Sequence, residues 1–144
     1  MSRGLLFAML AVAALPAIAT ERLVTIDAPA SVAAGVQIKV SIRAHTDAGE
    51  GEQIGFFHAE YSIDDGKTWT GIVYEDHIGT EATRLGTFTA GPEGSKAMVR
   101  VRIAFRGGPA GDVDFNGAAI KWKNSWEDWE QPPAKYATIT VKSP

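Results

Sequence analysis

Alternation of apolar and polar residues is the feature that most constrains the fold of this 144-residue chain. In the stretch 36–43, Val36, Ile38, Val40 and Ile42 alternate with polar residues. Because successive side chains of a β-strand point to opposite faces, this pattern predicts a strand with one buried and one solvated face. Similar stretches recur between clusters of Gly, Pro and Asp, whereas helical periodicity is scarce. We expect strands at 23–27, 36–43, 57–63, 68–74, 85–90, 99–106 and 137–142.

These seven short strands, separated by turn residues, predict an all-β fold: one domain built as an antiparallel β-sandwich. The connection between Phe105 and Tyr136 is too long for a simple hairpin. Long connections in compact domains usually carry function or structure of their own. Within this one we expect a short extra strand at 115–122 and one or two helical turns at 126–130.

Residues 1–19 have the three parts of a secretory signal peptide. Arg3 is followed by the apolar run 5–15 and by Ala17-Ile18-Ala19, a small-x-small cleavage site. The apolar run is too short to span a bilayer, so we expect cleavage and no stable membrane insertion afterwards. The mature protein would then be the single domain 20–144, with a retained membrane anchor as the alternative.

Composition narrows the class of protein further. The chain has no cysteine, which excludes a disulfide, a thiolate metal site and a lipid-anchored lipoprotein. Its formal charge of −3 becomes −4 when Arg3 is lost, which is ordinary for a soluble protein and gives no argument for nucleic-acid binding. A sandwich without cysteine favours a periplasmic or secreted bacterial protein over a eukaryotic one.

The stretch "SIDDGKTW", residues 62–69, has the pattern of a tight hairpin. Gly66 supplies the positive φ that such a turn needs, and Asp64 can accept hydrogen bonds from nearby N–H groups. A two-residue loop would leave Trp69 on the solvated face, whereas a three-residue loop would pair it with Tyr61 and bury it. We favour the buried position, because an exposed indole is costly.

The same eight residues resemble the Asp-box, S-x-D-x-G-x-T-W, of sialidases and other β-propellers. They also resemble the hairpin of the immunoglobulin-like C-terminal domain of sulfite oxidases, and "MVRVRIAFRGG" is similar to a strand that follows it. Propellers repeat the box, while this chain has it once. The resemblance therefore implies an immunoglobulin-like (early-set) sandwich in which Asp64 is structural. The sulfite oxidase domain also implies a role in dimerisation.

Trp122, Trp126 and Trp129 lie within eight residues of the long connection. Their spacing would place them on one face if the segment were helical. Indole rings stack on sugar rings, so the three residues are candidate anchors for a glycan. Two alternatives remain: a small satellite core that pins the connection to the sandwich, and a protein-binding surface.

The run from Asp112 to Gly117 matches the first half of a calcium-binding loop, with candidate oxygen ligands at Asp112, Asp114 and Asn116. The twelfth position should be a bidentate Glu but is Lys123, so an EF-hand is rejected. A different calcium site, completed by Glu127 or Glu130, is one interpretation, and ordinary turn residues are the other.

Other polar residues form weaker patterns. His45, His58 and His77 lack the spacing of a metal site. If the strands that carry them are neighbours, one solvated face holds His58, Glu60, Arg100, Arg102 and Tyr136. Cross-strand Glu–Arg pairs explain such a face, and a ligand surface is the alternative.

The sequence thus predicts a secreted, non-enzymatic binding module that recognises a glycan or protein partner through the connection 107–133. The first alternative is a structural or dimerisation subunit of a periplasmic complex, in a homo- or hetero-oligomer. The second is a metal-binding sandwich or small hydrolase. Catalysis has little support, since G-x-S-x-G, P-loop and H-E-x-x-H motifs are absent.

Overall fold

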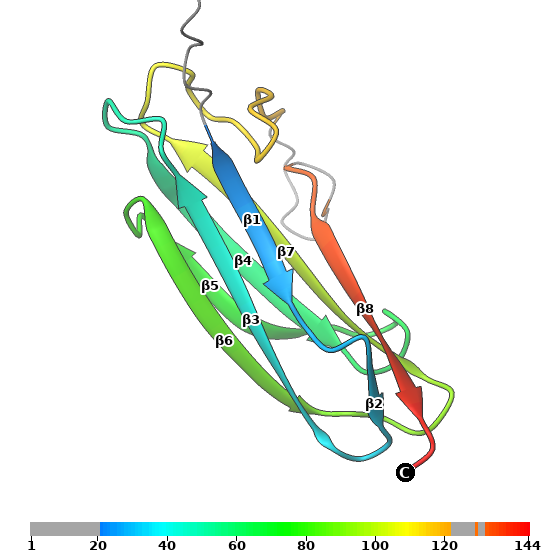
Figure 1. Ribbon diagram of the computed structural model, residues 1–144. Coiled ribbons are helices and arrows are strands. Elements are labelled where there is room, and N and C mark those ends of the chain that lie inside the picture. The colour runs from blue at the N-terminus through cyan, green and yellow to red at the C-terminus, as the bar shows by residue number, and fades with distance from the viewer. Residues whose placement is uncertain (1–20, 122–128, 130–131) are drawn as a thin grey trace, which may run out of the picture.

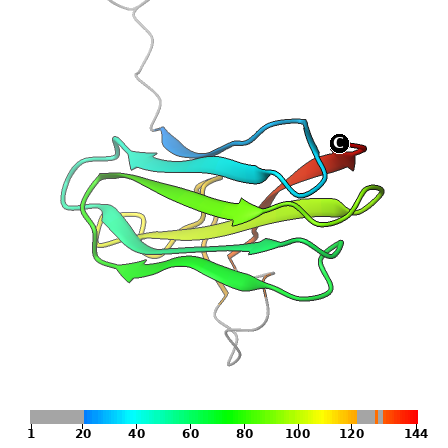
Figure 2. The ribbon, with the colours of Figure 1, turned by 90° about the horizontal axis from the view of Figure 1, so that it is seen from below.

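The computed structural model describes residues 21–121, 129 and 132–144, which form a two-layer β-sandwich (Figure 1). A three-stranded sheet has the order β1-β3-β6, and a five-stranded sheet has the order β2-β8-β7-β4-β5. The view along the layers shows the two sheets stacked face to face (Figure 2). The strands are β1 (Arg22–Asp27), β2 (Ser31–Ala33), β3 (Gln37–Thr46), β4 (Gln53–Ser62), β5 (Thr70–Asp76), β6 (Glu81–Thr89), β7 (Lys96–Arg106) and β8 (Lys135–Lys142).

This strand order is that of an immunoglobulin-like fold. β1 pairs with β3 in one sheet, and after a bend at Ala30 the chain crosses to the other sheet, where β2 pairs with β8 in parallel. The other strand pairs are antiparallel. The predicted sandwich and the long connection before the last strand are therefore confirmed. The sequence did not predict β2, because three residues are too few to show an alternation of apolar and polar side chains.

The core lies between the sheets and is built from the alternating apolar residues. Ile38, Val40 and Ile42 of β3 face Val99 and Val101 of β7, and all five are buried. On β3 their outward neighbours are polar, so burial of one face sets the register of this strand.

A β-bulge changes this pattern in β4. Gly55 occupies the register shift between Ile54 and Phe56. A side chain there would collide with Arg106, since a Cβ on Gly55 would lie 2.4 Å from the Arg106 Cδ. The bulge lets Phe57 enter the core while Phe56 stacks with His58 on the outer face of the five-stranded sheet.

The first part of the long connection is irregular. The sequence predicted an extra strand at 115–122. In the described part, residues 115–121, no strand forms, and Ala119 makes an isolated bridge with Val113. The prediction is wrong there because a turn forms instead: the Gly117 N–H donates to the Asp114 carbonyl at 3.0 Å. The helical turns predicted at 126–130 lie outside the described residues except for Trp129, which is in a turn.

One side of the sandwich is open, where β5 and β6 are the last strands of their sheets. The Glu75 carboxylate of β5 accepts hydrogen bonds at 2.6 and 2.9 Å from the Arg84 guanidinium of β6, which ties the two sheets together there. Among the described residues, no helix is long and apolar enough to cross a membrane.

Candidate recognition face

The hairpin between β4 and β5 closes on its own side chains. Asp64 accepts hydrogen bonds from the Thr68 N–H at 2.9 Å, the Thr68 hydroxyl at 2.6 Å and the Ser62 hydroxyl at 2.7 Å. The Thr68 bonds and then the Ser62 bond lower the pKa of Asp64 to about 2. Asp65 bonds the backbone of Lys96 on β7 through both its N–H and its carboxylate. Asp64 is thus a turn-closing residue, as its pattern indicated.

The prediction that Trp69 pairs with Tyr61 and enters the core is wrong. Tyr61 pairs with Thr70 instead, because the loop closed by Asp64 and Thr68 is longer than three residues. Trp69 lies on the outer face of the five-stranded sheet and is partly exposed. Its ring meets Tyr136 of β8 edge-on, with the centroids 6.4 Å apart.

Arg100 of β7 is the centre of this outer face. Its Cζ lies 4.0 Å from the ring centroids of both Trp69 and Trp129, so the guanidinium packs against two indoles. The same group donates to the Glu60 Oε1 of β4 at 3.0 and 2.5 Å. The Tyr74 hydroxyl of β5 donates to the other oxygen of Glu60.

The face continues along β7 to Arg102 and His58. The Arg102 Cζ lies 4.3 Å from the Trp129 ring, and its Nε donates to the His58 Nδ1 at 3.4 Å. Burial and then the Arg102 charge lower the pKa of His58 to about 4. His58 is therefore neutral at pH 7, although its Nε2 lies 3.9 Å from an oxygen of Asp76.

We call these residues the aromatic–arginine face. The strands that carry His58, Arg100 and Tyr136 are neighbours, as the shared face required, and the register places His58 opposite Arg102, Glu60 opposite Arg100, and Arg100 opposite Tyr136. Tyr74 and Tyr136 are 57% and 52% exposed and offer large, amphipathic contact surfaces. The members of the face are Phe56, His58, Glu60, Trp69, Tyr74, Arg100, Arg102, Trp129 and Tyr136.

Of the three tryptophans predicted to bind a ligand, only Trp129 is among the described residues. It is 8% exposed, with its ring packed against Arg100 and Arg102. Trp122 and Trp126 lie outside the described residues. The ligand platform of Trp122, Trp126 and Trp129 stays a prediction.

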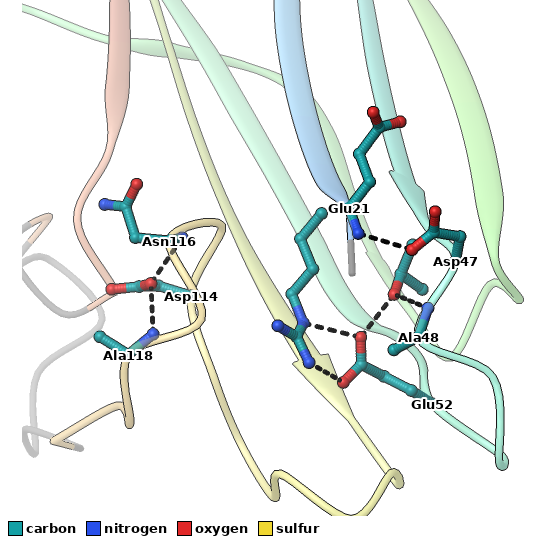
Figure 3. Close-up of polar contacts among 9 residues, drawn as sticks. Glu21, Asp47, Ala48, Glu52, Asp114, Asn116 and Ala118 are labelled. Carbon is teal, nitrogen blue, oxygen red and sulfur yellow. Dashed lines mark hydrogen bonds and ion pairs between the residues drawn. The ribbon is translucent and has the colours of Figure 1, made fainter. Parts of the chain in front are cut away.

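Two of the three candidate calcium ligands, Asp112 and Asp114, use their carboxylates in local contacts. The buried Asp114 carboxylate accepts from the N–H groups of Asn116 at 2.8 Å and Ala118 at 3.1 Å, while the Asn116 amide points away from it (Figure 3). The Asp112 carboxylate lies 3.4 Å from the Arg106 Nε. Residues 21–121, 129 and 132–144 contain no group of three His, Cys, Asp or Glu side chains that could hold a metal ion. Glu127 and Glu130 lie outside this part of the chain, so the calcium site stays a prediction.

A buried ion pair at the same end of the sandwich was missed. The Arg22 guanidinium donates at 2.9 and 2.8 Å to Glu52, whose side chain is 0% exposed, and Thr46 donates to Glu52 at 2.5 Å (Figure 3). Burial raises the pKa of Glu52, but the bonds from Arg22 and Thr46 outweigh it and leave the pKa below its usual value. No sequence pattern marks this pair, because its residues belong to different elements that are far apart in the chain.

The turn of the long connection rests on this pair. A Cβ at Gly117, whose φ is +80°, would lie 3.1 Å from the Arg22 Nη1, so a side chain there would crowd the guanidinium. Arg22 of β1 therefore lies against both the loop that carries Glu52 and the 114–118 turn.

By its strand order and layer packing, the chain belongs to the class of immunoglobulin-like β-sandwiches. Comparison with models of protein families and with curated proteins found no match. Among solved structures, the chain is similar to the sporulation control protein Spo0M from Bacillus subtilis, with 12% sequence identity and a TM-score of 0.40. The match covers 89% of this chain and 51% of Spo0M, so the chain spans about half of that protein's length.

Proposed function

We propose that this protein is a secreted, non-enzymatic recognition module that binds a protein partner through the aromatic–arginine face. The observation that carries the proposal is the gathering of Trp69, Tyr74, Arg100 and Tyr136 on one sheet face. Trp, Tyr and Arg are the residues most enriched at the energetic centres of protein interfaces. The predicted signal peptide supports a location outside the cytoplasm.

The internal contacts of the face favour recognition by a preformed surface. Arg100 is held by Glu60 and two indoles, and Glu60 is held in turn by Tyr74. A surface whose side chains are already ordered loses less entropy when it binds. The exposed rings of Tyr74 and Tyr136 would make the first contacts.

The packing of Trp69 and Trp129 favours a protein partner over a glycan. A sugar ring stacks on an open indole face, whereas the ring of Trp129 is buried and that of Trp69 is packed against Arg100. Trp122 and Trp126 are the residues through which a glycan would bind, so the test below includes Trp126.

Photo-crosslinking in the source cells tests the proposal. A photoreactive p-benzoylphenylalanine replaces Tyr136 or Tyr74 on the recognition face. The control replaces Thr25, an exposed residue of β1 on the other sheet. We expect the same protein adduct from both tyrosine positions and none from Thr25.

Two results would overturn the proposal. One is an equal set of adducts from all three positions. The other is a tryptophan fluorescence shift on a carbohydrate panel that Trp126→Ala abolishes, which would assign the module to glycans.

A further inference from the structure

The exposed edge of β6 has backbone groups that no described strand uses. β6 is the last strand of its sheet and has β3 as its one neighbour there. The Ala90 N–H donates to the Val36 carbonyl at 2.8 Å and the Thr80 carbonyl accepts from the Thr46 N–H at 2.9 Å, so even-numbered residues bond toward β3. Because the direction alternates along a strand, odd-numbered residues point their N–H and C=O groups away from β3. These residues are Glu81, Thr83, Leu85, Thr87 and Thr89.

Natural sheets usually protect such an edge with Pro, Lys, a bulge or a short strand. β6 is nine residues long, has neither Pro nor Lys, and pairs with β3 without a register shift. At its midpoint Leu85 is 76% exposed, more than any other large apolar side chain that the structure describes. The Arg84 Nη1 donates to the Thr83 carbonyl at 2.9 Å and so occupies one of these outward-facing groups.

The sequence of β6 is complementary to itself in one antiparallel register. About a two-fold axis at Leu85, Leu85 lies opposite Leu85 of a second copy, Thr83 opposite Thr87, and Glu81 opposite Thr89. Paired threonines and paired apolar residues stabilise neighbouring strands, and no like charges face each other. On the inner face Arg84 lies opposite Gly86, which has no side chain to obstruct it.

We propose that β6 pairs with β6 of a second copy of this chain, antiparallel and centred on Leu85, to give a six-stranded sheet across the dimer. The occupant is a second copy because the chain itself carries the matching sequence. Arg84 is already paired with Glu75, so the interface buries no uncompensated charge from it. This proposal is independent of the recognition face, which lies on the other sheet.

A single cysteine tests the register directly, because the chain has none of its own. Paired residues of this kind have Cα atoms about 5.5 Å apart, within the range of a disulfide. We expect Leu85→Cys to form disulfide-linked dimers under mild oxidation. Thr83→Cys is the matched control: it lies on the same strand and face, but its two copies would be about 14 Å apart.

Association of the purified protein gives the second readout. We expect sedimentation velocity to show a dimer that Leu85→Lys weakens at least tenfold by placing like charges opposite each other. Thr87→Pro should have the same effect, since it removes an N–H that β3 does not use. Thr25→Lys, on β1 at the far edge of the same sheet, should leave the dimer unchanged.

The proposal fails if the protein stays monomeric at high micromolar concentration, or if a dimer forms that neither Leu85→Lys nor Thr87→Pro weakens. Equal crosslinking of Leu85→Cys and Thr83→Cys would also overturn it, because the proposed register brings only position 85 to its own copy. The photo-crosslinking of Tyr136 tests the recognition face and is independent of these measurements of dimerisation. The two proposals can therefore fail separately.

Discussion

At the scale of single residues, His58 shows how the sheet changes the chemistry of one side chain. Its ring stacks on Phe56 with centroids 4.5 Å apart and meets Tyr74 edge-on at 5.6 Å. Burial and Arg102 act together against the imidazolium, while Asp76 and Glu60 act more weakly in its favour. The folded protein therefore binds the His58 proton less readily than the unfolded chain does.

This difference predicts a loss of stability in acid. Between pH 6.5 and about 4 the unfolded chain takes up the proton first, so the free energy of unfolding falls as the pH falls. The full shift corresponds to about 3 kcal/mol at most. Urea unfolding from pH 7.5 to 4 should show a flatter pH profile for His58→Gln. His77→Gln, in the loop between β5 and β6, is the control; equal profiles for the two variants would contradict the prediction.

At the scale of elements, β1 depends on a bond that its own sequence does not reveal. Arg22 at its first position reaches the buried Glu52 between β3 and β4, and the neighbouring Glu21 N–H donates to Asp47 at 2.6 Å. The bonds fix the start of an edge strand that pairs with one described strand, β3.

Removing one partner of this ion pair should be strongly destabilising. Glu52→Ala leaves the Arg22 guanidinium without its carboxylate, and we expect the free energy of unfolding to fall by about 3–5 kcal/mol. Hydrogen exchange should become faster in β1 than in β7. Glu81→Ala, which removes an exposed carboxylate paired with Arg43, is the control and should cost far less, because water screens an exposed ion pair. Similar losses for both variants would show that burial of Glu52 is not decisive.

At the scale of the whole molecule, Trp129 joins the long connection to the body of the sandwich. Its indole packs against Arg100 and Arg102 on β7, although β7 ends at Arg106 and the chain returns only at Lys135. The described residue Trp129 and the outer face of the five-stranded sheet therefore form one surface.

Trp129→Ala should loosen that surface. We expect a loss of about 3–5 kcal/mol in the free energy of unfolding, typical of a buried Trp truncated to Ala. Proteolytic cleavage within 107–134 should also become faster. Trp129→Phe keeps an aromatic ring for both arginines to pack against, so its free energy of unfolding should fall clearly less. Unchanged stability and cleavage in Trp129→Ala would mean that this contact does not hold the connection.

Much of the fold follows from local patterns. The period of two in β3, β4, β7 and β8 is enough to assign each face, because burial of one face is the dominant stabilising term. The same period predicted that Glu60 and Arg100 share a face, and Asp64 could be recognised as a turn residue from its neighbours alone.

The remaining features needed the tertiary structure. The position of Trp69 depends on how many residues the Asp64 turn encloses, and one residue more or less moves an indole across the sheet. The Arg22–Glu52 pair and the stack of Arg100 on two indoles join segments that no local pattern connects, since loop geometry brings them together. The sequence by itself determined the strands other than β2, their buried faces and the sandwich. Only the tertiary structure decided which side chains meet on its surface, because those contacts depend on loop length, strand order and the open edge of β6.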